Sequence, residues 1–121
     1  MEKNTSQDGE SMFTKLIRKE LNDITILHED DKSIAFKDIN PVGPIHFQVI
    51  PKKKITRLED ADEEDAVLLG HLMIVAKNVA REQGLKNGYR VVLNNGRDGG
   101  QIVDYLNLDV IGGRAMSWPP G

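Results

Sequence analysis

One long segment with helical periodicity constrains the fold of this chain more than any other feature. Between residues 61 and 83 apolar side chains recur at helical spacing, and an acidic cluster over residues 59–65 lies where negative charge favours a helix N-terminus. Gly84 follows at the position of a C-cap. The apolar stripe is broad enough to face both a sheet and a second copy of itself, and it comprises Leu68, Leu69, Leu72, Met73, Val75, Ala76, Val79 and Ala80.

Short segments with strand character flank this helix on both sides. Turn-forming residues separate the first three, and a glycine-rich loop over residues 95–100, which we expect to be flexible, divides the last two. The expected strands span residues 24–28, 33–38, 44–50, 89–94 and 104–111. The pattern predicts an α+β fold with an antiparallel meander before the helix.

A second, shorter helix is expected near the start of the chain, where Ser11 can cap it. Its apolar residues recur at helical spacing and are Met12, Phe13, Leu16 and Ile17. Residues 2–10 are polar and offer no apolar side chains to bury. We therefore predict a disordered tail over residues 1–10 and a single domain over residues 11–121.

Composition excludes several classes of function. Sixteen basic and nineteen acidic residues give a net charge of −3, so no overall positive field favours nucleic acid or an anionic membrane. The absence of cysteine excludes disulfides, thiolate metal sites and cysteine nucleophiles. No segment has the length of a membrane span or the character of a secretory signal. We expect a protein of the cytoplasm, with the nucleus as a second compartment, and no membrane or nucleic-acid partner.

Several stretches of the chain resemble the Hint branch of the histidine-triad (HIT) family in order and spacing. They are residues 38–41, 44–53, 70–73, 88–92 and the closing run Gly-Gly-Arg-Ala-Met-Ser-Trp-Pro-Pro-Gly over 112–121. The resemblance implies the HIT fold, a five-stranded antiparallel sheet with one long and one short helix. It also implies a homodimer with a continuous ten-stranded sheet, and nucleoside phosphoramidate hydrolysis through a covalent nucleotidyl-histidine.

The same resemblance implies a pocket for a purine nucleoside monophosphate. Asp38 would bind the ribose hydroxyls, and the glycine-rich loop would bring backbone amides to the phosphate. Carried over by position, the pocket comprises Met12, Phe13, Leu16, Phe36, Asp38, Ile39, Asn94, Gly100, Gln101, Asn107 and Asp109. His46, Arg114 and Trp118 would lie at the rim of the pocket and the dimer interface.

Where the family pattern has its three histidines, this chain has Tyr105, Asn107 and Asp109. In a strand over residues 104–111 the three alternate onto one face, opposite a core face of Leu106, Leu108 and Val110. The simplest interpretation is that the three mark a solvent face. Taken with the resemblance, however, Asn107 replaces the nucleophile with an amide that cannot form a phosphoryl intermediate. Asp109 replaces a donor with an ionised acceptor, which should weaken phosphate binding.

Further departures lie at the same expected pocket. Ile102 stands where the Hint pattern has a serine, Lys37 where it has a histidine, and Gln48 where it has an apolar residue. We predict a catalytically impaired HIT protein that acts as a binding or regulatory module, as a homodimer or as a heterodimer with an active relative. Two alternatives stay open: a hydrolase that uses Asp109 as nucleophile or general base, and a structural partner without a ligand.

Neither a cofactor nor a metal is expected. Asp109, Asn107 and His46 are conceivable ligands because oxygen and imidazole suit divalent ions, but no pair of histidines has metal-binding helical spacing. A structural role is the preferred interpretation for both His46 and His71.

Overall fold

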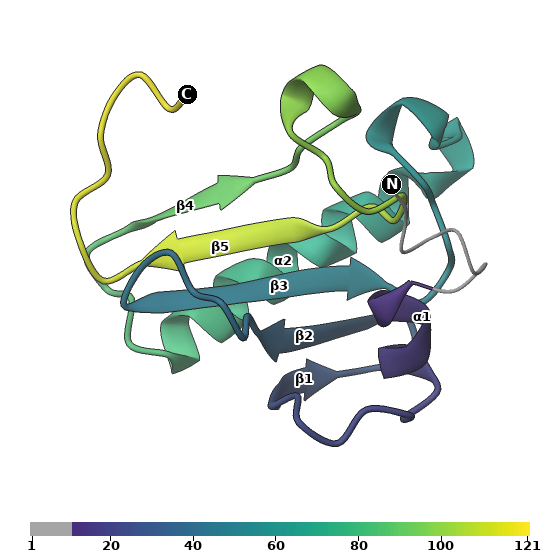
Figure 1. The fold of residues 1–121 in the computed structure, drawn as a ribbon, viewed down its shortest axis with the longest axis horizontal. Helices are drawn as coiled ribbons and strands as arrows, with labels where there is room; N and C mark the ends of the chain where they lie inside the picture. Colours follow the sequence, from purple (N-terminus) through teal and green to yellow (C-terminus); the bar gives the residue numbers. More distant parts are fainter. Residues whose placement is uncertain (1–10) are drawn as a thin grey trace.

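The computed structural model describes residues 11–121, so the tail expected over residues 1–10 lies outside the described residues. Its centre is one antiparallel sheet with the strand order β1-β2-β3-β5-β4. Figure 1 shows α2 crossing one face of this sheet and α1 beside the β1–β2 end. The strands are β1 (Ile26–Glu29), β2 (Ser33–Lys37), β3 (Ile45–Pro51), β4 (Tyr89–Val92) and β5 (Leu108–Gly112). The α+β expectation, with five strands and one long and one short helix, is confirmed.

The long helix, α2 (Ala66–Glu82), begins later than residue 61. The acidic residues before it form two 3₁₀ turns, η2 (Leu58–Asp60) and η3 (Glu63–Asp65), in place of a first helical turn. Asp62 and Asp65 make a reciprocal capping box across η3, which satisfies backbone donors that the helix would otherwise leave unpaired. The sequence pattern predicted the region of the helix correctly, but the capping box between Asp62 and Asp65 determines where the helix begins.

The C-terminal end of α2 is as expected. Gly84 has a φ of 85°, and the Leu85 amide donates to the Ala80 carbonyl at 3.0 Å, as in a Schellman cap. Leu85 is buried and anchors the chain as it leaves the helix. The hydrogen bond that ends the helix therefore also places the Leu85 side chain in the core.

The core between α2 and the sheet is apolar on both sides. One face of α2 contributes buried residues, and alternate strand residues such as Phe47, Val49 and Val110 meet it. The expected core residues Leu106, Leu108 and Val110 are all buried in this cluster. Within residues 11–121 no helix combines the length and apolar character required to cross a bilayer.

A second buried cluster lies beneath α1 (Met12–Ile17), with Phe13, Phe36 and Tyr105 among its members. The Ser11 hydroxyl caps α1 by accepting a hydrogen bond from the Thr14 amide at 3.2 Å, as expected. The rings of Phe13 and Tyr105 meet edge to face at 5.5 Å between centroids. This cluster covers only part of the sheet surface opposite α2.

The last expected strand is too long in our prediction. β5 begins at Leu108, because the Leu106 amide donates to the Ile55 carbonyl at 2.6 Å and holds the preceding residues in a separate turn. The glycine-rich loop likewise contains an ordered 3₁₀ turn, η4 (Arg97–Gly99). Residues 104–111 therefore form a turn followed by a strand and not one continuous strand. For this reason the side chains of Tyr105, Asn107 and Asp109 do not all point to the same face.

Candidate functional site

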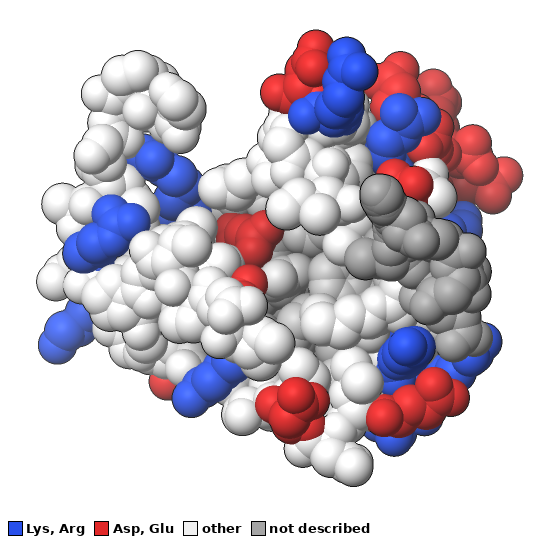
Figure 2. Space-filling model, in the orientation of Figure 1, with Lys and Arg blue, Asp and Glu red and all other residues white. Residues whose placement is uncertain are grey.

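Two adjoining cavities open on the face of the sheet opposite α2. Their volumes are about 260 Å³ and 240 Å³, and Phe13, Asp38, Gln48 and Val103 line both. Figure 2 shows this face, with acidic side chains at the bottom of a central hollow. We call the larger the polar cavity, lined also by Asn94, Gly100, Gln101, Ile102, Asn107 and Asp109. The other is the apolar cavity, lined also by Met12, Ile24, Phe36, Lys37, Ile39 and Asn40.

The structure gathers most of the expected pocket residues around these cavities. Each of them except Leu16 lines one cavity or the other. Leu16 is only 1% exposed and lies in the cluster beneath α1. The three departures from the family pattern, Lys37, Gln48 and Ile102, also line the cavities.

Asp38 lies where β2 ends, at the junction of the two cavities. Its backbone amide donates to the His46 carbonyl at 3.0 Å, which ties the residue to β3. Its carboxylate accepts hydrogen bonds from the Asn40 amide and from Gln48 Nε2, each at 2.8 Å. The carboxylate is therefore held in one orientation before any ligand arrives.

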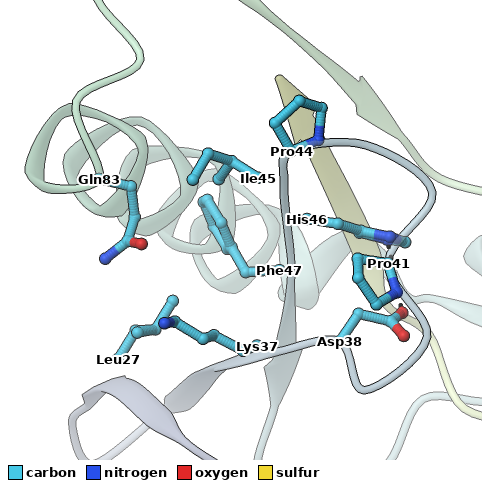
Figure 3. A pocket seen from close by; sticks show the side chains of 9 residues that line it. All are labelled: Leu27, Lys37, Asp38, Pro41, Pro44, Ile45, His46, Phe47 and Gln83. Carbon is cyan, nitrogen blue, oxygen red and sulfur yellow. Dashed lines mark ion pairs between the residues drawn. The ribbon is translucent and has the colours of Figure 1, made fainter. Parts of the chain in front are cut away.

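His46 joins two carboxylates of the site. Its Nε2 lies 2.8 Å from Asp109 Oδ1 and 3.4 Å from Asp38 Oδ2, and its side chain is only 6% exposed. Figure 3 shows His46, Pro41 and Asp38 together on one side of β3, with Ile45 and Phe47 on the other. A smaller cavity of about 120 Å³ is lined by His46, Asp38 and other residues of this region.

The hydrogen bonds of His46 determine where its proton lies. The Val42 amide donates to Nδ1 at 3.2 Å, so Nδ1 acts as an acceptor and the proton of the neutral ring is on Nε2. Nε2 therefore donates to Asp109. Burial raises the pKa of the Asp109 carboxyl, the hydrogen bond from His46 opposes that rise, and the nearby Asp38 adds to it.

Asp38, His46 and Asp109 also form a possible metal site. Asp38, His46 and Asp109 each offer one ligand atom, and these atoms lie within 4.8 Å of one another. A metal-bound histidine normally donates its other ring N–H to an acceptor. His46 instead accepts the Val42 N–H at Nδ1, which keeps the proton on the nitrogen that would bind the ion. The set has suitable atoms but does not fit a metal ion in this hydrogen-bonding state.

Tyr105 does not belong to the cavity wall, contrary to the expectation of three outward-facing polar residues. It is 1% exposed, and its hydroxyl donates to the Pro51 carbonyl at 2.7 Å. Burial raises the pKa of this hydroxyl to about 12. Asn107 does line the polar cavity, and its Nδ2 donates to the Tyr105 carbonyl at 3.0 Å. Only Asn107 and Asp109 of the three thus face the cavity.

The glycine-rich loop is held by Gln101. Its Oε1 accepts the Gly96 amide at 2.8 Å, and its Nε2 donates to the carbonyls of Thr56 and Val103 at 2.7 and 2.9 Å. Gly100, with a φ of 89°, packs beside Asn94. Gln101 therefore positions the loop with its own side chain fully hydrogen-bonded.

Arg114 and Trp118 lie outside both cavities. Arg114 donates to the Val42 carbonyl at 3.2 Å, while Trp118 is 80% exposed with the Arg90 guanidinium 6.0 Å from its ring centroid. His71 is also away from the site, where its Nε2 lies 2.8 Å from Asp30 Oδ2.

The sequence groups His46 with Asp109 only as conceivable metal ligands and does not predict the hydrogen bond between them. The β3–β5 register places Gln48 opposite Asp109, and His46 is two residues along the same face. Polar residues at alternate positions of a strand with otherwise apolar neighbours were the available signal.

Comparisons with known proteins agree with this architecture. A sequence model of the HIT domain matches residues 18–116. An uncharacterised HIT-like protein of Synechocystis is 47% identical over 112 residues, covering 93% of this chain and 97% of that protein. A maize protein named "14 kDa zinc-binding protein" is 47% identical over 116 residues, and the match covers 94% of this chain and 90% of the maize protein.

Among solved structures, a HIT family hydrolase from Legionella pneumophila superposes with a TM-score of 0.89. It is 41% identical in sequence, and the match covers 93% of this chain and 100% of that one. The similarity in sequence and in fold thus extends over nearly the whole described domain. The chain belongs to the HIT domain family.

Proposed function

We propose that this chain is a Hint-like purine nucleoside-binding module without the covalent chemistry of the histidine triad. The observation that carries the proposal is the pair of adjoining cavities, one apolar and one polar, with Asp38 at their junction. Small-molecule sites are typically concave, mostly apolar and provided with a few placed polar groups. This arrangement suits a purine base in the apolar cavity, a ribose at Asp38 and the 5′ substituent in the polar cavity.

The chemistry of the polar cavity supports binding without turnover. No histidine lines either of the two cavities, and Asn107 offers an amide in place of an imidazole. Asp109, the other candidate nucleophile, accepts a hydrogen bond from His46 Nε2 at 2.8 Å, which engages one of its carboxylate oxygens. The rival hydrolase that uses Asp109 has less support than the binding module.

The proposed biological unit is a dimer, formed with a second copy or with an active relative. We assign no role to a metal, although the maize relative is named for zinc. The proposed location is the cytoplasm.

Calorimetric titration with adenosine and guanosine tests the binding proposal. We expect saturable binding, weakened about tenfold or more by Asp38→Ala, because loss of a charged hydrogen-bond partner typically costs at least ~1.5 kcal/mol. Asp31→Ala, at an exposed position on the β1–β2 turn, is the matched control and should bind as the parent does. If neither adenosine nor guanosine binds, the binding proposal is wrong and the alternative of a structural partner without a ligand is favoured.

Incubation with a labelled nucleoside phosphoramidate tests the second half of the proposal. We expect no turnover and no protein adduct. Hydrolysis that Asp109→Ala abolishes, or an adduct mapped to Asp109, would establish the rival enzyme.

A further inference from the structure

The side-chain donors around the polar cavity are largely used inside the protein. Gln48 Nε2 donates to the Asp38 carboxylate, and the Gln101 and Asn107 amides donate to backbone carbonyls. His46 Nε2 donates to Asp109. Among the described side chains of this cavity, those that remain for a ligand include the Asn94 amide and the acceptor carboxylates of Asp38 and Asp109.

In the described part of the chain these two carboxylates have no lysine or arginine beside them, and His46 is the basic side chain that lies between them. Their side chains are 16% and 21% exposed, and within residues 11–121 neither is paired with lysine or arginine. No lysine or arginine lines the polar cavity. Lys37 lines the apolar cavity and the smaller cavity beside His46, and it is exposed. The neutral tautomer of His46 leaves the negative charge of the carboxylates uncompensated.

A partly buried carboxylate is stabilised by a cationic donor and destabilised by a second anion. A 5′ phosphate in the polar cavity would approach Asp109 and meet no lysine or arginine on its wall. An ammonium group in the same position would donate hydrogen bonds to that carboxylate and compensate its charge.

From this arrangement we propose that the pocket selects purine nucleosides that carry an ammonium group at the 5′ end, in preference to nucleoside 5′-monophosphates. The inference rests on the proposed function, because it takes the base and ribose as placed there. The inference adds the charge of the preferred ligand, and it identifies Asp109 as the residue that distinguishes ligands by the charge at their 5′ end. The pocket thereby discriminates against the phosphate-bearing ligands that its fold would otherwise suit.

Titration with three probes tests the preference: adenosine, adenosine 5′-monophosphate and 5′-amino-5′-deoxyadenosine, whose primary amine is protonated near neutral pH. We expect the amine to bind about tenfold more tightly than adenosine, and the monophosphate about tenfold more weakly. Asp109→Asn removes the charge with little change of shape and should bring the three affinities together. Asp98→Asn removes one negative charge from an exposed position of η4 and should leave the order unchanged.

The outcomes separate the two proposals. If adenosine binds but the monophosphate binds as tightly or more tightly, the charge preference is wrong and the nucleoside pocket stands. If none of the three probes binds, both proposals are wrong. If Asp109→Asn binds the three probes with the same order of affinities as the parent, Asp109 is not the residue that causes the charge preference.

A measurement on the unaltered protein covers the case in which Asp109→Asn fails to fold. Raising the salt concentration screens charge interactions, so it should weaken binding of the amine and strengthen binding of the monophosphate, with adenosine nearly unaffected. Equal salt dependence for all three probes would contradict the proposal.

Discussion

At the scale of single residues, the Tyr105 hydroxyl has a structural partner, and Tyr105 lines neither the polar nor the apolar cavity. It donates to the Pro51 carbonyl at 2.7 Å within the cluster beneath α1. Tyr105→Phe should lower the free energy of unfolding by about 1–2 kcal/mol, because a buried hydrogen bond is lost and the carbonyl loses a donor. Urea denaturation measures this change. Nucleoside affinity should stay the same, and weaker binding at unchanged stability would place Tyr105 in the pocket after all.

Asp30 is the residue whose titration should affect stability most clearly. Burial alone would raise its pKa, but hydrogen bonds from His28, the Lys32 amide, His71 and Ser33 outweigh burial and hold the pKa well below the ordinary 3.8. The native state therefore favours the ionised carboxylate. Its stabilising contribution is complete above pH 3.8 and is lost as the pH falls below that value toward the native pKa.

Asp30→Asn tests this contribution. It should cost about 2 kcal/mol at neutral pH, since hydrogen bonds to a charged group are lost, and it should flatten the acid limb of the stability profile. Urea unfolding between neutral pH and pH about 3 measures both effects. Asp31→Asn, at the exposed neighbouring position, should change neither. Identical acid limbs for the parent and Asp30→Asn would contradict the assignment.

At the scale of elements, two glycines of the α2 region should respond to alanine in opposite directions. Gly84 has a φ of 85°, where a β-carbon is strained, so Gly84→Ala should cost about 1 kcal/mol. Gly70 lies inside the helix with nothing within 4 Å of an added β-carbon, so Gly70→Ala should stabilise by about 0.5–1 kcal/mol. Thermal unfolding of the two variants checks the signs. Destabilisation by Gly70→Ala would mean that another chain packs closely there.

The elements themselves were largely predictable, whereas their ends were not. Helical spacing identified both helices because the apolar faces of α1 and α2 meet the sheet directly. The beginning of α2 depends on the Asp62–Asp65 capping box, and that of β5 on a hydrogen bond from Leu106 to a distant loop. The spacing of apolar residues along the sequence predicts neither of these two contacts, so it could not give the first residue of either element.

The candidate site was predictable only in part for a similar reason. The resemblance supplied the residues around both cavities, since positions carry over within one fold. The contact between His46 and Asp109 joins residues 63 apart and follows from strand register. The burial of Tyr105 follows from the turn before β5, which a uniform strand pattern conceals.

At the scale of the whole molecule, exposed apolar side chains support the proposed dimer. Val67 and Ile74 lie seven residues apart, on one face of α2, and are 76% and 52% exposed. β4 is an edge strand, and its Tyr89 is 36% exposed. We expect light scattering to give twice the monomer mass. Ile74→Glu should shift the protein toward monomer, while Val42→Glu, at a position 60% exposed on the β2–β3 connection, should not. A monomeric parent protein would refute the dimer.

We propose that this HIT-family pocket binds a purine nucleoside in the absence of triad chemistry. Saturation-transfer NMR of adenosine 5′-phosphoramidate with the purified protein tests both halves in one sample. We predict saturation transfer to the base protons, displaced by excess adenosine, and a ligand spectrum that does not change with time. Release of adenosine 5′-monophosphate in excess over protein would show an enzyme. No saturation transfer to this ligand or to adenosine alone would show that the pocket does not bind a purine nucleoside, and either result contradicts the proposal.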